Sequence, residues 1–176
     1  MCWMPKSLIA MGCVIVCGGS AVAEVQVELK KTHVCCGQCE KAVAKVLETD
    51  GVKGSASKSD GSVKFTAPDD KTAQKVLDDL CAAGFHGTVE SKTLTIKDDS
   101  GAPDGKVTSL TLKGVHNCCG ACNNAIKAAI KKVAGVESDD AKAKSETLTI
   151  KGNFDAKALI KALNDEGFHA TVDKDK

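Results

Sequence analysis

The eight residues THVCCGQC at positions 32–39 recur as VHNCCGAC at positions 115–122, with five of the eight identical. A second pair of matching stretches, Gly84-Phe85-His86 and Gly167-Phe168-His169, is separated by the same 83 residues (32 to 115, and 84 to 167). Self-similarity at a fixed spacing is the signature of a repeated structural unit. The sequence therefore predicts two copies of one small domain, each with a cysteine-rich loop near its start.

Hydrophobic periodicity predicts the same order of elements in both copies. Residues 25–30 alternate apolar with polar side chains, as a half-buried strand does, and the cysteine loop then opens an amphipathic helix. Two short strands, a second helix and a closing strand follow. The order βαββαβ in about 70 residues is the ferredoxin-like arrangement. The predicted fold class is therefore α+β, with two tandem ferredoxin-like domains.

The predicted domain boundaries follow from composition. Residues 1–23 are predicted to be a signal peptide, 24–97 the first domain and 106–176 the second. Residues 98–105, DDSGAPDG, are polar and rich in turn formers, which is typical of a linker. The stretch TLTI at 93–96 is predicted to prolong the last strand of the first domain.

The first 23 residues have the pattern of an export signal. Lys6 precedes a short apolar run at 8–17, and Ala21-Val22-Ala23 is an A-x-A cleavage site followed by polar Glu24. The run is shorter than the roughly 20 residues that a membrane-spanning helix needs, and no other membrane segment is predicted. We expect a periplasmic or secreted protein. The alternative is a lipoprotein signal acylated at Cys13 or Cys17.

Composition excludes some classes of function. The formal net charge is +1, and the chain has no tyrosine. It also lacks arginine. Without arginine it has no side chain for bidentate hydrogen bonds to phosphate, and without tyrosine it lacks stacking rings typical of nucleic-acid recognition. Of ten cysteines, seven follow residue 23, and six of those crowd into the two repeated loops. An odd number with such local spacing makes a poor disulfide framework, which indicates a chemical role.

The chemistry of the loop depends on its place before a helix. Thiolates in the first turn are stabilised by unsatisfied backbone N–H groups and by the helix dipole, and the sulfurs of a Cys-x-x-Cys pair converge on one ion. Thiolates select soft ions such as Cu(I) and Zn(II). Two thiolates suit a linear ion, whereas an added cysteine and histidine would build the Cys₃His set that zinc prefers. The predicted metal ligands are Cys36, Cys39, Cys119, Cys122, Cys35, Cys118, His33 and His116.

The remaining two histidines and the remaining cysteine lie outside the repeated cysteine loops. In a ferredoxin-like domain the loops after the first strand and before the last lie at the same end of the sheet. His86 and His169 could therefore approach the sites of Cys36 and Cys119; alternatively each only turns the chain, with the preceding Phe in the core and the ring in solvent. Cys81 has Asn164 as its counterpart, and we expect it to be a small buried apolar residue.

These residues resemble the heavy-metal-associated domain family, which includes exported mercury-binding proteins, copper chaperones and modules of metal-pumping ATPases. The family pattern is Gly-Met-x-Cys-x-x-Cys before the first helix, with Gly-Phe or Gly-Tyr before the last strand. The two Cys-x-x-Cys pairs, both Gly-Phe pairs and the Gly-Val pairs at 51–52 and 135–136 match it. The resemblance implies one soft ion per domain, Cu(I), Zn(II) or Hg(II), passed to a metal transporter or another metal-binding domain.

The chain departs from that pattern at three positions in each loop. Histidine replaces the family glycine at 33 and 116, Val34 and Asn117 replace the methionine, and Cys35 and Cys118 are additional. A richer ligand set favours holding the ion over handing it on.

Two alternative functions belong to other classes of protein, an enzyme and a structural protein. Cys-Gly-x-Cys at a helix start also resembles the active site of thioredoxin-like dithiol/disulfide oxidoreductases, although the second unit contains no proline to serve as that family's cis-proline. The other alternative is a structural repeat protein with disulfide-closed loops. We predict a metal-binding protein and not an enzyme.

Overall fold

The computed structural model describes residues 24–145 and 147–174. The predicted signal peptide and its cleavage site lie outside the described residues. The first domain consists of β1 (Val25–Lys30), α1 (Gly37–Leu47), β2 (Lys53–Ser57), β3 (Ser62–Ala67), α2 (Asp70–Ala82) and β4 (Thr88–Val89). The second consists of β5 (Lys106–Lys113), α3 (Gly120–Lys131), β6 (Val136–Asp139), β7 (Thr147–Asp155), α4 (Ala156–Asp165) and β8 (Thr171–Val172).

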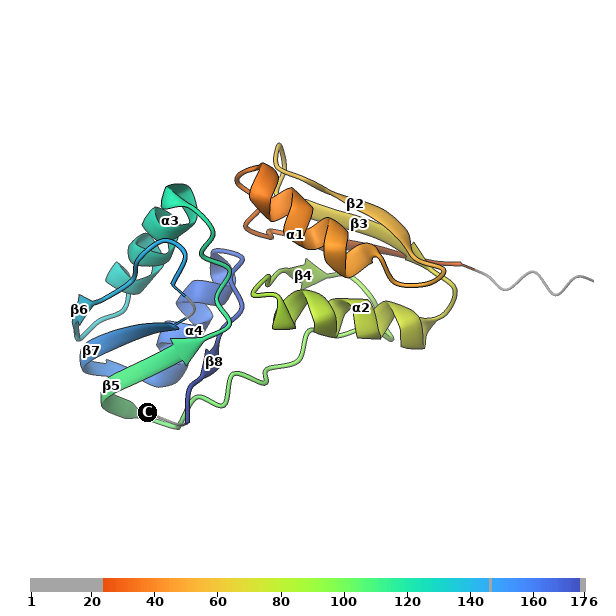
Figure 1. The fold of residues 1–176 in the computed structure, drawn as a ribbon. Coiled ribbons are helices and arrows are strands. Elements are labelled where there is room, and N and C mark those ends of the chain that lie inside the picture. Colours follow the sequence, from red (N-terminus) through yellow and green to blue (C-terminus); the bar gives the residue numbers. More distant parts are fainter. Residues whose placement is uncertain (1–23, 146, 175–176) are drawn as a thin grey trace, which may run out of the picture.

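Each domain is an antiparallel four-stranded sheet with two helices. The strand orders are β2-β3-β1-β4 and β6-β7-β5-β8, so the predicted α+β class and the two ferredoxin-like repeats are confirmed. Figure 1 shows the two bodies side by side, joined by a long extended segment. The alternation predicted for the first strand also holds, because Val27 and Leu29 are buried while Gln26 and Glu28 are exposed. Residues 98–105 remain a predicted linker.

The predicted extension of the last strand into residues 93–96 is wrong. β4 ends at Val89, and the following segment instead packs on α2. Leu94 enters the core, and the Gln74 side chain holds both backbone groups of Thr95, donating to its carbonyl at 2.8 Å and accepting from its N–H at 3.0 Å. A side chain thus satisfies the backbone groups that a strand partner would have satisfied.

The two domains meet around the repeated Gly-Phe-His turns. Phe85 and Phe168, both buried, form an antiparallel bridge with each other. His86 N–H donates to the Gly167 carbonyl, and His169 N–H donates to the Gly84 carbonyl, each at 3.0 Å. The two hydrogen bonds join equivalent residues in opposite directions. The interface therefore has the reciprocal form of a two-fold axis.

Candidate metal centre

The two cysteine loops have the same backbone conformation at the start of α1 and α3. Cys36 and Cys119 are the N-cap residues, with extended φ values of −155° and −151°. Neither makes a side-chain capping hydrogen bond with the described residues. By contrast, Asp69 caps α2 by accepting from the Thr72 N–H at 2.6 Å. The first turns of α1 and α3 therefore offer backbone N–H groups to the cysteine sulfurs.

The structure brings the sulfurs of both loops together into one cluster. Contacts within a loop include Cys36 Sγ to Cys39 Sγ at 3.8 Å and Cys119 Sγ to Cys122 Sγ at 3.7 Å. Contacts between the loops are equally short. They are Cys35 to Cys119 at 3.7 Å, Cys35 to Cys122 at 3.4 Å, Cys36 to Cys118 at 3.8 Å, Cys36 to Cys119 at 3.9 Å, Cys39 to Cys118 at 3.7 Å and Cys39 to Cys122 at 3.9 Å.

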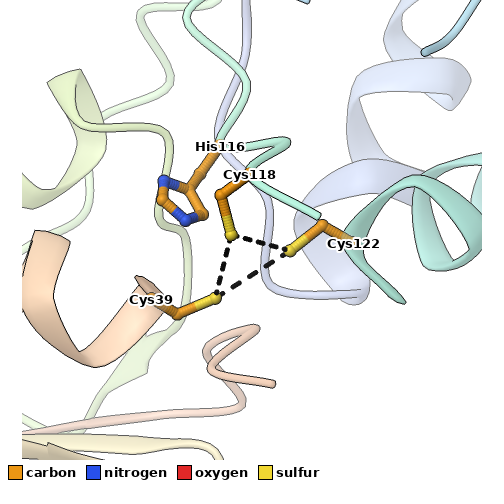
Figure 2. A group of neighbouring side chains, drawn as sticks. All are labelled: Cys39, His116, Cys118 and Cys122. Atoms are coloured by element: carbon orange, nitrogen blue, oxygen red, sulfur yellow. Dashed lines mark hydrogen bonds between the residues drawn. The ribbon is translucent and has the colours of Figure 1, made fainter. Parts of the chain in front are cut away.

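These separations are those of thiols and not of disulfides, whose sulfurs lie about 2.05 Å apart. They match sulfurs that share an ion. With metal–sulfur bonds of about 2.3 Å, two sulfurs on a three- or four-coordinate ion lie about 3.8–4.0 Å apart, whereas a linear pair would lie about 4.6 Å apart. Figure 2 shows Cys39 from the first domain beside Cys118 and Cys122 from the second. The geometry therefore favours higher coordination than the linear pair.

His33 and His116 lie at this cluster. Ring nitrogens of the two histidines fall within 4.8 Å of sulfurs, His116 with Cys39, Cys118 and Cys122, and His33 with Cys35 and Cys122. The Nε2 atom of each ring is buried and has no hydrogen-bond partner among the described residues. Such an atom is costly to bury, and a bound ion would compensate it. Burial lowers the pKa of both rings, which keeps them neutral and able to bind metal.

Aromatic stacking across the domain interface holds both rings. His33 stacks on Phe168 and His116 stacks on Phe85, each with centroids 4.3 Å apart and an interplanar angle of 28°. Each ring is therefore supported by the Gly-Phe-His turn of the other domain.

His86 and His169 take neither of the positions expected from the sequence. They stack on each other with centroids 6.1 Å apart, and neither belongs to a group of metal-ligand side chains found among the described residues. His169 is buried, and its Nε2 lies 2.9 Å from Asp99 Oδ1. These histidines belong to the domain interface.

The thiols of the cluster differ in acidity. The backbone N–H of Cys122 lowers the pKa of the Cys119 thiol to about 6. Burial opposes ionisation of Cys39, but the backbone N–H groups of Cys35 and Cys36 outweigh it and lower its pKa. For three further thiols, those of Cys35, Cys118 and Cys122, burial is the largest cause of a raised pKa. Crowded thiols cannot all ionise without a cation, which would displace their protons.

Cys81 lies apart from the cluster. It is a buried residue of α2, and burial raises the pKa of its thiol to about 12. The prediction that it is a small buried residue is confirmed.

The heavy-metal-associated domain model matches residues 110–169. The crystal structure of oxidized MerP from Ralstonia metallidurans CH34 is 30% identical over 38% of this chain and 96% of that chain, with a TM-score of 0.33. The solution structure of the N-terminal soluble domains of Bacillus subtilis CopA is 17% identical over 88% of this chain and 97% of that chain, with a TM-score of 0.33. No curated protein matches.

The chain belongs to the heavy-metal-associated domain family. It carries metal-binding domains with cysteine clusters, and its class is that of metal-binding carriers and not of enzymes. The thioredoxin-like alternative is therefore wrong. Within residues 24–145 and 147–174, no helix has the length and apolar character needed to cross a membrane.

Proposed function

We propose that this chain is an exported protein that binds soft metal ions, Cu(I) foremost, through its two Cys-x-x-Cys pairs. The observation that carries the proposal is the clustering of six thiols at 3.4–3.9 Å beside buried, unpartnered imidazole nitrogens. Thiolate and imidazole donors exclude hard cations such as Mg²⁺ and Ca²⁺ as preferred cargo. Zn(II) and Hg(II) are the other ions that the donor set suits.

The burial of the cluster favours holding the ion. Cys39 and Cys122 are fully buried, and the other four cysteines are half-buried between the domains. A partner domain or transporter reaches such a site only when the two domains separate. We therefore propose that the closed chain sequesters its cargo and that opening of the interface precedes delivery.

Metal content tests the binding proposal. Anaerobically purified protein, loaded with Cu(I) and desalted, should hold one ion per domain by elemental analysis. Cys36→Ser combined with Cys39→Ser should halve that content, because one pair of ligands is lost. Cys81→Ser is the matched control and should leave it unchanged. A parent chain without bound Cu(I), or unchanged content in the double variant, contradicts the proposal.

Export is proposed from residues 1–23 alone. N-terminal sequencing of the chain from its native host should begin at Glu24 if cleavage follows Ala23. A chain that keeps Met1 in the cytoplasm would contradict export, and a lipid-modified cysteine would indicate the lipoprotein alternative.

A further inference from the structure

Each of the additional cysteines, Cys35 and Cys118, has one sulfur neighbour in its own loop. Cys35 Sγ lies 3.7 Å from Cys39 Sγ, and Cys118 Sγ lies 3.7 Å from Cys122 Sγ. Among the described residues no thiol–thiol hydrogen bond joins Cys35 to Cys36, and the same holds for the second loop. Across the interface, Cys35 Sγ also lies 3.7 Å from Cys119 Sγ and 3.4 Å from Cys122 Sγ. Each additional cysteine therefore has both members of the other domain's pair as sulfur neighbours.

The sulfur contacts divide into triangles in only one way that uses all six sulfurs. One triangle joins Cys36, Cys39 and Cys118, with edges of 3.8, 3.8 and 3.7 Å. The other joins Cys119, Cys122 and Cys35, with edges of 3.7, 3.4 and 3.7 Å. The internal repeat of 83 residues converts one triangle into the other. Edges this short fit three sulfurs around one ion, for which about 4.0 Å is expected with bonds of about 2.3 Å.

We propose that each metal ion is bound by the Cys-x-x-Cys pair of one domain and by the additional cysteine of the other domain. This inference rests on the proposed function and concerns the ligand set within it. The cargo is a soft ion that accepts three thiolates, with Cu(I) as the probe. On binding, the ion displaces protons from the thiols that are protonated, and no electron is transferred.

The histidines also reach ligands of the other domain. We call this crossing of metal ligands between the two domains the exchange. A ring nitrogen of His116 lies within 4.8 Å of the sulfurs of Cys39, Cys118 and Cys122, of which Cys39 belongs to the other domain. A ring nitrogen of His33 lies within 4.8 Å of the sulfurs of Cys35 and Cys122, of which Cys122 belongs to the other domain. The segments 33–35 and 116–118 thus each reach across to the other domain's pair. The stacking of His33 on Phe168, and the bond from His33 N–H to the Gly167 carbonyl at 3.3 Å, hold one of these segments against its target domain.

The exchange has a consequence for regulation. A bound ion cross-links the two domains at two places, so loading stabilises the closed form and separation of the domains removes one ligand from each ion. The affinity of each site therefore depends on the interface, which a single isolated domain does not have.

The test uses a double variant, called the background, in which only one of the two proposed metal sites remains. In full-length Cys36→Ser/Cys39→Ser, only the triangle of Cys35, Cys119 and Cys122 remains. Adding Cys35→Ser should weaken Cu(I) binding roughly tenfold or more, since even indirect partners of metal ligands are worth about 10–100-fold. Adding Cys118→Ser instead removes the additional cysteine that the proposal assigns to the lost site, so it should weaken Cu(I) binding clearly less than Cys35→Ser does. Affinity is measured by competition with a coloured Cu(I) chelator, and circular dichroism checks the fold.

The opposite pattern, in which Cys118→Ser weakens the remaining site and Cys35→Ser does not, would show that each additional cysteine serves its own domain. Equal effects, or no effect of either, would also overturn the exchange. In all three cases the background still binds Cu(I), so the proposed function stands. If the parent chain itself binds no Cu(I), the proposed function fails first. Cys119→Ser/Cys122→Ser provides the reciprocal background, in which the roles of the two additional cysteines should be reversed.

Discussion

Val34 and Asn117 occupy equivalent buried positions under the two cysteine loops, although one is apolar and the other polar. The amide of Asn117 is held by its surroundings, since Nδ2 donates to Asn123 Oδ1 at 3.1 Å and to the Lys142 carbonyl at 3.0 Å. These two hydrogen bonds anchor the second loop through the amide nitrogen, although Asn117 Oδ1 is buried without a hydrogen-bond partner among the described residues. The second loop therefore keeps the conformation of the first.

A prediction at the scale of single residues concerns His33. His33→Ala should leave Cu(I) bound and weaken Zn(II) by roughly tenfold or more, because a tetrahedral zinc site needs a fourth donor that three thiolates do not supply. His33→Phe is the matched variant: it keeps an aromatic ring against Phe168 but has no nitrogen. Both variants should behave alike in competition titrations with the two metals. Equal loss of both metals would contradict a role for the imidazole in zinc binding.

At the scale of elements, the turns that precede β4 and β8 set the spacing of the domains. Gly84 and Gly167 have φ values of +86° and +83°, in the left-handed region. A Cβ on Gly84 would lie 2.2 Å from the His116 backbone nitrogen, and one on Gly167 would lie 2.3 Å from that of His33. The absence of a side chain thus allows the turn of each domain to touch the metal loop of the other.

Gly167→Ala should therefore open the interface. The added methyl meets backbone atoms of the first domain, so we expect a larger radius of gyration in solution scattering and Cu(I) affinity at least about tenfold lower, as for the loss of a ligand's supporting contact. Gly105→Ala is the control, because Gly105 has the same φ of +83° but no atom within 4 Å of its virtual Cβ. That variant should show only the left-handed strain of roughly 1–2 kcal/mol. Identical scattering and identical Cu(I) affinity for both variants would contradict the role of Gly167 in the close approach of the two domains.

At the scale of the whole molecule, the interface buries titratable groups. His86 and His169 stack on each other, and the Nδ1 atom of each ring is buried without a hydrogen-bond partner among the described residues. Burial lowers the pKa of both, and the neighbouring carboxylates of Asp98, Asp99 and Asp165 only partly oppose the shift. Two cations at this distance would also repel each other, so the closed form requires neutral rings.

Acid should therefore destabilise the metal-free protein. Below the unfolded-state pKa of about 6.5 the unfolded histidines take up protons that the folded ones exclude. The free energy of unfolding is then highest above that pH and falls as pH decreases toward the lowered folded-state pKa. Thermal unfolding between pH 7.5 and 5.5 should show this fall, and His86→Gln/His169→Gln should reduce it. If thermal stability falls with decreasing pH as steeply in the double variant as in the parent chain, the pH dependence does not come from His86 and His169.

Local sequence patterns were enough to predict the repeated βαββαβ order and the location of both cysteine pairs at helix starts. Periodicity of buried residues and turn-forming glycines are local signals, and they survive in the folded chain because each element buries the face that its own pattern specifies. The same signals failed at residues 93–96, where contacts with α2 replace a strand partner.

Which sulfurs lie together depends on contacts between the two domains. The spacing within a loop predicts that Cys35 lies near Cys36 in the chain, but not that its sulfur faces Cys119 and Cys122. That arrangement depends on the bridge between Phe85 and Phe168 and on two glycines that permit close approach. These contacts join residues of different domains, from 32 positions apart (Gly84 and His116) upwards, and no local pattern encodes them. The sequence therefore predicts two separate loops, whereas the fold makes them one centre.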